Sequence, residues 1–447
     1  MFNKILIANR GEIAVRIIRA CREMGIKTVA VYSEADREAL HTQLADESIC
    51  IGKASSTDSY LNMERIICAT IATKADAIHP GFGFLSENSK FASLCETCNI
   101  KFIGPSAAII DKMGNKSEAR NTMIAANVPV VPGTKEPVYD AVVGKKISDE
   151  MGYPVIVKAS SGGGGKGMRI IHSAVEFDHN FSNAQRESIN SFGDNTMYIE
   201  KYIANPRHIE FQILADNFGN VIHLGERDCS IQRRHQKMIE ESPSIAISEE
   251  LRTQMGETAI RAAKAVNYQS VGTIEFLLYK NNNFYFMEMN TRIQVEHGVT
   301  ELVTGTDLIR EQISIAANLP LSYKQEDILI RGHAIECRIN AENPDKNFMP
   351  CPGKITDMHI PGGNGVRIDT AIYTGYEIPP FYDSMILKVM VYDRDRQSAI
   401  KKMINVLGEV VIEGVSTNLD FQYKILNNED FQNGKVDTHF IQEHYDM

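Results

Sequence analysis

Short apolar runs alternate with helical patterns along the first hundred residues. Residues 4–8 and 28–32 have the pattern of strands, and between them apolar side chains from Ile13 to Met24 recur at helical spacing until Gly25. Further helical patterns cover 60–73 and 91–98, and further strand patterns cover 77–79 and 101–103. Strands that alternate with helices predict a parallel sheet wrapped by helices.

The first turn of this region argues against a nicotinamide site. It contains Asn9-Arg10-Gly11-Glu12 in place of Gly-x-Gly-x-x-Gly, so the glycines that admit a pyrophosphate are missing. We therefore predict a Rossmann-like N-terminal domain that serves another purpose.

The pattern changes twice further along the chain. A helix that opens at 114–116 is followed by a region rich in glycine and β-branched residues at 133–203, by hairpins, and by an alanine-rich helix at 249–265. A length of 447 residues suggests about three domains. We predict domains at 1–112, 113–330 and 331–447, with α/β architecture at the N-terminus, α+β architecture in the middle and a mixed C-terminal domain.

Composition narrows the class of protein. The 47 Lys and Arg against 57 Asp and Glu give a net charge of −10, which argues against nucleic-acid binding through the overall field. No stretch approaches the roughly 18 uncharged apolar residues of a membrane span, and the N-terminal apolar run is too short for a secretory signal. Eight cysteines are too few for a disulfide scaffold. We expect a cytoplasmic protein that binds neither nucleic acid nor membrane.

A glycine-rich loop is the first chemical motif. Gly162–Gly167 follows a strand that ends near Lys158, and a strand pattern resumes after it. A P-loop would require Ser or Thr where Met168 stands, and then a helix, so the glycines fit the tip of a hairpin that folds over phosphates. Lys158 could then reach a phosphate. The alternative is a mobile surface loop beside a solvated lysine.

A pair of carboxylates across a hairpin is the second motif. If Asn281 and Asn282 form a two-residue turn, Glu275 and Glu288 lie directly opposite each other. Their repulsion calls for a cation, and Mg²⁺ with Asn290 as a further oxygen ligand would supply one. A three-residue turn would break this register and leave two solvated glutamates.

Two clusters of polar residues complete the candidate chemistry. The segment 227–237 holds four cations in eleven residues, as either a solvated face or an anion patch. In an extended chain Arg292, Gln294 and Glu296 share one face, so a small oxyanion could be gripped by the cation and deprotonated by the base. The alternative is an ordinary surface strand. His208 and His297 lack a second histidine at ligand spacing and fit structural or nucleotide contacts better than metal ligation.

Together these stretches closely resemble biotin carboxylase, the ATP-grasp component of acetyl-CoA carboxylase and its relatives. The resemblance covers essentially the whole chain and rests on the segments 7–14, 79–88, 162–167, 226–237 and 288–297. It implies an ATP-grasp domain with a mobile glycine-rich lid at about 133–203. It also implies that bicarbonate attacks MgATP to give carboxyphosphate, which breaks down to CO₂ that N1′ of biotin captures.

The resemblance implies a role for each matching residue. ATP would be bound by Lys116, Lys158, Gly164, Gly165, Glu200, Lys201, Ile203, His208, Gln232 and His235. Mg²⁺ or Mn²⁺ would be held by Glu275, Glu288 and Asn290, and bicarbonate by Lys237, Arg292, Gln294 and the backbone of Val295, with Glu296 as its general base. Arg338 would stabilise the enolate-like biotin anion, and the lid would exclude water.

Two residues depart from the family pattern. The family usually has Tyr where Phe82 stands, near biotin, and Pro where Gly298 stands, which adds backbone freedom beside the proposed base. Neither removes a reacting group, so we expect activity to survive.

The partners follow from what the sequence does not contain. It has no biotinylation motif, so we expect a separate biotin carboxyl carrier protein, separate carboxyltransferase subunits and a homodimer. Acetyl-CoA carboxylase is the favoured setting, and pyruvate, propionyl-CoA and 2-oxoglutarate carboxylases are alternatives. Another ATP-grasp carboxylate ligase, or a non-catalytic nucleotide-binding regulator, fits the motifs less well.

Overall fold

The computed structural model describes residues 1–160 and 167–445. Contacts divide the described chain into two compact units. The main unit contains Met1–Gly114, Arg207–Phe276 and Glu288–Met447, and the small unit contains Asn115–Pro206 and Leu277–Met287. No helix in the described ranges combines the length and the apolar character needed to cross a bilayer.

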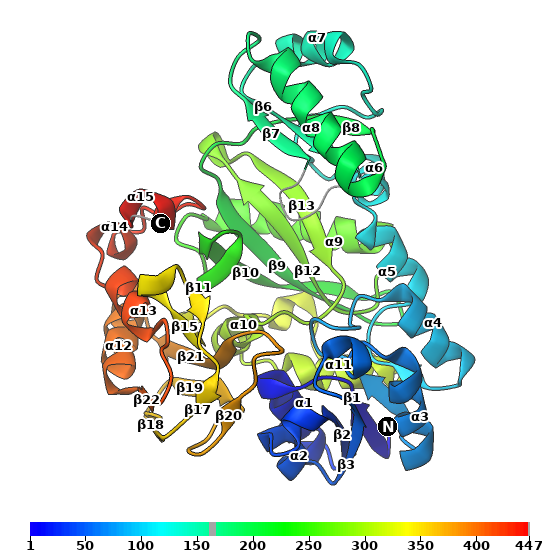
Figure 1. Cartoon of the computed structure of the whole chain (residues 1–447), viewed down its shortest axis with the longest axis vertical. Helices are drawn as coiled ribbons and strands as arrows, with labels where there is room; N and C mark the ends of the chain where they lie inside the picture. The colour runs from blue at the N-terminus through cyan, green and yellow to red at the C-terminus, as the bar shows by residue number, and fades with distance from the viewer. Residues whose placement is uncertain (161–166, 446–447) are drawn as a thin grey trace. The chain divides into compact units, whose positions relative to one another are not determined.

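A five-stranded parallel sheet forms the N-terminal part of the main unit (Figure 1). Its strands are, in order across the sheet, β3 (Glu47–Gly52), β2 (Lys27–Ser33), β1 (Lys4–Ile7), β4 (Ala77–His79) and β5 (Lys101–Phe102). The helices of this part are α1 (Gly11–Glu23), α2 (Leu40–Leu44), α3 (Met63–Thr73), α4 (Ser89–Thr97) and α5 (Ala107–Gly114). The predicted α/β architecture is confirmed, although β3, half exposed and weakly patterned, was not predicted.

A second, eight-stranded sheet carries the candidate chemistry. Its strands are, in order, β13 (Phe284–Asn290), β12 (Ser270–Leu278), β9 (Arg207–Ala215), β10 (Val221–Arg233), β11 (Gln236–Ser242), β14 (His333–Asn340), β21 (Met385–Asp393) and β19 (Val366–Thr370). The ladders from β9 to β19 are antiparallel. Residues from the predicted second and third domains therefore share one sheet, which places their side chains in a continuous row.

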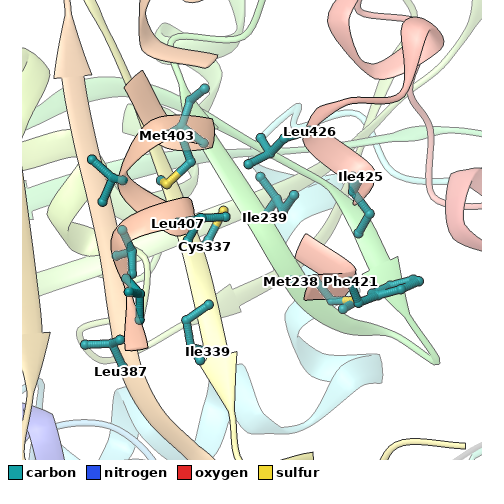
Figure 2. Packing of buried hydrophobic residues seen from close by; sticks show 14 of the residues in the cluster. Met238, Ile239, Cys337, Ile339, Leu387, Met403, Leu407, Phe421, Ile425 and Leu426 are labelled. Carbon is teal, nitrogen blue, oxygen red and sulfur yellow. The ribbon is translucent and has the colours of Figure 1, made fainter. Parts of the chain in front are cut away.

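Apolar packing fixes both sheets of the main unit. Ile5 and Ile13 from the first sheet and its helix α1 belong to one core cluster with Leu214 and Ile309, from β9 and α11 (Leu308–Ala316). On the C-terminal side, strand residues such as Ile239 and Leu387 pack against α12 (Arg396–Glu409) and α13 (Leu419–Leu426), as Figure 2 shows. The rows of polar side chains are thus carried on strands whose apolar faces are fully buried.

Further helices and short strand pairs complete the main unit. They are the helices α9 (Glu249–Ala265), α10 (His297–Thr304), α14 (Glu429–Gln432) and α15 (Phe440–His444), and the strand pairs β15 (Glu342–Asn343) with β16 (Met349–Pro350), β17 (Gly353–Lys354) with β20 (Glu377–Ile378), and β18 (Asp357–His359) with β22 (Val411–Glu413). The bounds of α9 match the alanine-rich helix predicted from the sequence.

The small unit is built on a three-stranded antiparallel sheet. Its strands are β7 (Met168–Ile171), β6 (Val155–Ala159) and β8 (Met197–Lys201), and its helices are α6 (Lys116–Ala125), α7 (Ala141–Met151) and α8 (Phe177–Phe192). Lys158 pairs with Met168 across β6 and β7, which confirms a hairpin around the glycine-rich segment. The glycines predicted to bind ATP, Gly164 and Gly165, lie outside the described residues.

Candidate active site

Five neighbouring strands of the large sheet present charged side chains to one another. Lys237 on β11 is the centre of this group, and its Nζ lies 2.5 Å from Glu210 Oε2, 3.0 Å from Glu275 Oε1 and 2.6 Å from Glu296 Oε1. Burial disfavours the ammonium charge, but the three carboxylates outweigh it and raise the pKa of Lys237 well above its usual range. Lys237 is therefore a permanent cation at neutral pH.

Glu296 joins two cations. Its Oε1 accepts from Lys237, and its Oε2 accepts from Arg338 Nη2 at 2.9 Å. Burial opposes its charge, but Lys237 and Arg338 prevail and hold the pKa of Glu296 well below the usual value. In this arrangement Glu296 is deprotonated. It can accept a proton only when Lys237 or Arg338 moves away from its carboxylate.

Arg338 is fixed from its other side by Glu240. The guanidinium Nε donates to Glu240 Oε1 at 2.6 Å. Burial raises the pKa of Glu240 to about 7, although Arg338 pulls it down. The guanidinium is thus held between two carboxylates, Glu240 and Glu296, which restricts its orientation.

A shift of register in β11 lets Lys237 and Glu240 reach the same cluster. They lie three positions apart, and a regular strand would place them on opposite faces. The ladder between β10 and β11 is irregular between Ile231 and Gln232, where Ile231 pairs with Ile239 and Gln232 with Lys237. Such irregularities re-aim side chains next to active sites.

The floor of the cluster consists of groups that sequence reasoning did not assign. Arg227 is fully buried and donates to Glu210 Oε1 and Gln294 Oε1, both at 2.6 Å. Glu210 was missed altogether. Its signal was the alternation of His208, Glu210 and Gln212 with apolar residues on β9, which predicts a polar row along one face.

The residues predicted to bind bicarbonate come together in part. Gln294 donates to Glu275 Oε1 at 2.7 Å, and Lys237 and Glu296 are in contact as described. Arg292 instead donates through Nε to Glu87 Oε2 at 2.8 Å, and Glu87 also accepts from the Thr291 N–H. Glu87 was not assigned a role from the sequence; it orients the arginine at the start of the loop that ends at Glu296.

The candidate metal ligands differ in exposure. Glu275 is buried and its Oε1 accepts from Asn290 Nδ2 at 2.9 Å, whereas Glu288 is exposed. His208 Nε2 lies 2.9 Å from Glu275 Oε2, and the ligand atoms of His208, Glu210 and Glu275 all lie within 4.8 Å of one another. The amide oxygen of Asn290 accepts from Arg292 Nη2 at 2.9 Å. Two carboxylates and an amide offer the oxygen ligands that Mg²⁺ prefers, so the residue types fit the ion.

The predicted two-residue turn needs one correction. Asn281 and Asn282 both have positive φ, as in such a turn, and Asn283 N–H donates to Lys280 O. Tyr279 N–H, however, also donates to Asn283 O, so two residues of the first strand face one of the second. The extra residue is a bulge, and at the turn it shifts the register that would place Glu275 directly opposite Glu288.

The predicted ATP residues are distributed over both units. In the small unit Lys158 Nζ lies 2.5 Å from Glu200 Oε2, and Lys201 Nζ donates to Gly152 O at 2.8 Å. Lys116 begins α6 and is exposed, and Ile203 is buried. In the main unit Gln232 Nε2 lies 2.8 Å from His208 Nδ1, and His235 is exposed in the β10–β11 turn.

The two departures from the family pattern have different surroundings. Phe82 is half buried against the apolar core of the first sheet. Gly298 is buried in the first turn of α10, where a Cβ would lie 2.2 Å from Met390 Sδ. Packing against Met390 therefore leaves no space for a side chain at Gly298, whatever backbone freedom the glycine adds.

Comparisons with known proteins identify the family. The biotin carboxylase N-terminal domain matches residues 1–110, the carbamoyl-phosphate synthase L chain ATP binding domain matches 115–324, and the biotin carboxylase C-terminal domain matches 336–443. Biotin carboxylase 1 of Bacillus subtilis is 57% identical over 448 residues, which cover 100% of this chain and 99% of that protein. The chain belongs to the biotin carboxylase family.

Solved structures of the family agree with the fold. A biotin carboxylase–β,γ-ATP complex from Campylobacter jejuni superposes with a TM-score of 0.94 at 52% identity and covers 99% of each chain. The biotin carboxylase domain dimer of Hydrogenobacter thermophilus 2-oxoglutarate carboxylase, in complex with MgADP, ADP and bicarbonate, gives a TM-score of 0.92 at 49% identity, covering 99% of this chain and 98% of that one.

Proposed function

We propose that this chain carboxylates biotin at the expense of ATP, with bicarbonate as the carbon source. The observation that carries the proposal is the position of Glu296, whose two carboxylate oxygens contact Lys237 and Arg338 separately. Glu296 thereby contacts both Lys237, a cation suited to binding bicarbonate, and Arg338, a cation suited to binding the biotin anion. This is the ATP-dependent ligase activity for which the biotin carboxylase family is named.

Bicarbonate binding accounts for the present contacts of Lys237. We assign bicarbonate to Lys237, Arg292, Gln294 and the Val295 N–H, with Glu296 as the base that removes its proton. When Lys237 turns to the anionic substrate, Glu296 loses the cation that most strongly lowers its pKa. Its basicity then rises at the moment when bicarbonate must be deprotonated to attack the γ-phosphate.

We assign biotin to Arg338 and Phe82. Deprotonation of N1′ develops negative charge on the ureido oxygen, and a guanidinium held by Glu240 and Glu296 stabilises it without reorganisation. Attack of N1′ on CO₂ forms the new C–N bond. Phosphate, released from carboxyphosphate, takes the proton from N1′ in this scheme.

ATP and its metal complete the assignment. We assign the nucleotide to Lys116, Lys158, Gly164, Gly165, Glu200, Lys201, Ile203, His208, Gln232 and His235, and the metal to Glu275, Glu288 and Asn290. Bound Mg²⁺ would neutralise charge on the phosphates. Burial opposes the charge of Glu275, but Lys237, 3.0 Å from its Oε1, holds the pKa of Glu275 below its usual value and keeps the carboxylate ionised for such an ion.

The partners are part of the proposal. We place the chain in a homodimeric, cytoplasmic biotin carboxylase component that acts on a biotin carboxyl carrier protein and supplies a carboxyltransferase. Acetyl-CoA carboxylase is the setting we favour, supported by the relative of 57% identity that bears the name biotin carboxylase. The dimeric domain of 2-oxoglutarate carboxylase supports the dimer.

Phosphate release tests the reaction. Purified protein should release phosphate from MgATP only with bicarbonate, faster with free biotin, and should transfer labelled bicarbonate into biotin. Glu296→Gln should remove all three activities, whereas Glu249→Gln, at an exposed side chain, should leave them unchanged. ATP turnover that ignores both bicarbonate and biotin would refute the proposal.

Carrier domains test the setting. Purified biotinylated carriers of acetyl-CoA, pyruvate, propionyl-CoA and 2-oxoglutarate carboxylases should be compared at equal concentration, with kcat/KM for carrier carboxylation as the measurement. We expect the acetyl-CoA carboxylase carrier to be preferred by at least tenfold. Preference for any other carrier would assign the chain to that carboxylase, and light scattering of the same sample would show whether it is a dimer.

A further inference from the structure

A second buried lysine lies behind the loop that ends at Glu296. Lys388 is in the middle of β21 and is completely shielded from solvent. Its Nζ donates to the carbonyl of Val295 at 2.7 Å. Because that carbonyl belongs to the peptide that joins Val295 to Glu296, the ammonium group is bonded to the backbone of the proposed base.

The carboxylates around Lys388 are farther from it than this carbonyl. Glu12 Oε1 on α1 lies 3.4 Å away and Asp369 Oδ2 on β19 lies 3.8 Å away. Glu336, on the neighbouring strand β14, is fully buried, and neither of its carboxylate oxygens has a hydrogen-bond partner in the described part of the chain. These carboxylates keep Lys388 charged. Its shortest hydrogen bond is the one to the Val295 carbonyl in the loop that ends at Glu296.

The pKa values of these groups agree with that division of roles. Burial disfavours the charge of Lys388, but Glu12, Glu336 and Asp369 outweigh it and raise its pKa. Burial raises the pKa of Glu12 to about 7 despite Lys388. Of the other groups near it, Arg367 on β19 is a cation paired with Asp369, and burial holds the pKa of His297 well below its usual value, so this imidazole is neutral. Lys388 therefore keeps its proton.

We propose that Lys388 is a positioning residue, which holds the Val295–Glu296 peptide so that the Glu296 carboxylate stays between Lys237 and Arg338. This inference rests on the proposed function. A lysine kept only to balance charge would form its shortest contact with a carboxylate. Here the shortest contact is to a carbonyl, and a charge-assisted bond of that kind is roughly twice as strong as a neutral one.

The decisive variants separate charge balance from positioning. Lys388→Met keeps the length of the side chain but removes the cation paired with Glu12, so it is expected to lower the thermal midpoint. The double variant Lys388→Met with Glu12→Gln removes one buried acid together with the cation and should recover much of that midpoint. If Lys388 positions Glu296, this double variant still loses at least tenfold in kcat, with the KM for ATP within about twofold.

A matched control is available on the neighbouring helix. Lys402 on α12 also donates to a carbonyl of β21, that of Tyr392, at 2.7 Å, but this carbonyl lies outside the candidate site. Lys402→Met should therefore keep kcat within about twofold of the parent protein. A loss equal to that of the double variant would show that removal of any such bond is sufficient, and would overturn the inference.

Hydrogen exchange provides a readout that does not depend on activity. In the double variant, amides of 293–299 should exchange at least tenfold faster than in the parent protein, and Lys402→Met should not change them. Unchanged exchange, or recovery of kcat in the double variant, would overturn the role of Lys388. Absence of biotin-dependent turnover in the parent protein would refute the proposed function alone, because the exchange result would still stand.

Discussion

Two buried lysines of the main unit are surrounded by carboxylates, yet they are bonded differently. Lys237 has three carboxylate oxygens within 3.0 Å and retains 14% exposure of its side chain. Lys388 has no exposure, and among the described residues no carboxylate oxygen lies closer to it than the 3.4 Å of Glu12 Oε1; its close partner is a backbone carbonyl. The first can exchange its partners for an anion that enters from solvent, and the second cannot.

This difference indicates what each cluster is built to do. In the cluster around Lys237, both Lys237 and Arg338 are partly exposed and are paired with carboxylates that an anionic substrate could replace. In the cluster around Lys388, Glu336 and Glu12 have raised pKa values, because burial is not offset by close cations. The cluster around Lys237 can exchange a carboxylate partner for an anionic substrate, whereas the cluster around Lys388 holds the Val295–Glu296 peptide in place.

Removal of the exchangeable lysine should have the largest effect. We expect Lys237→Met to lower bicarbonate-dependent phosphate release about a thousandfold, the upper range for loss of one group that stabilises developing charge. Loss of the cation that Glu210, Glu275 and Glu296 share should also lower the thermal midpoint. Lys435→Met, at an exposed lysine paired with Asp430, is the control and should not change the rate. Activity within tenfold of the parent protein would contradict an exchange role for Lys237.

Removal of Arg338 should affect carboxylation of biotin more than bicarbonate-dependent ATP hydrolysis. Arg338→Ala is expected to lower carboxylation of biotin by at least about a hundredfold. Bicarbonate-dependent ATP hydrolysis without biotin should fall less, since Arg338 reaches the bicarbonate base only through Glu296 Oε2. Labelled-bicarbonate incorporation and phosphate release measure the two steps. An equal loss in both, or an unchanged rate of carboxylation, would remove Arg338 from biotin binding, and Arg394→Ala at an exposed position is the control.

Sequence reasoning predicted the parts of this site that lie close together along the chain. The alternation of apolar positions gave the parallel sheet, and the segment 288–297 gave Arg292, Gln294 and Glu296 as one group. Glu210, Glu240 and Lys388 come from three other strands, and only the order of strands in the sheet brings them to the same loop. The bulge at Tyr279 was equally hidden, because spacing along a sequence does not reveal how two strands pair around a turn.

The raised pKa of Glu12, in the cluster around Lys388, can be tested through the pH dependence of the free energy of unfolding. Glu12 has a folded-state pKa of about 7, above its value of 4.5 in an unfolded chain. Its contribution to stability is therefore fully present below pH 4.5 and is lost as the pH rises through 7. The difference in free energy of unfolding between Glu12→Gln and the parent protein should therefore shift in favour of the variant by about 2–3 kcal/mol as the pH rises from 4.5 to 8.

Thermal unfolding followed by far-UV circular dichroism across this pH range is the measurement, because the chain has no tryptophan. Groups that titrate in both the variant and the parent protein contribute equally, so they cancel when the two free energies of unfolding are subtracted. Glu47→Gln, at an exposed carboxylate paired with Lys4, is the control and should give a flat difference. A flat difference for Glu12→Gln as well would mean that Lys388 compensates Glu12 fully, and would remove the contrast between the two clusters.

The smallest expected effect concerns the contact between Gly298 and Met390, at the edge of the cluster around Lys388. A Cβ at Gly298 would lie 2.2 Å from Met390 Sδ, so Gly298→Ala should cost roughly 1–2 kcal/mol through overpacking, moderated by the flexibility of methionine. Gly408→Ala, on the exposed side of α12 with open space around the new methyl, should instead be neutral or stabilising by up to about 1 kcal/mol. Opposite signs in thermal unfolding would establish that packing, and not backbone freedom, selects glycine at 298. If Gly298→Ala also stabilises, the constraint behind the catalytic loop comes from Lys388 and not from the packing of Met390.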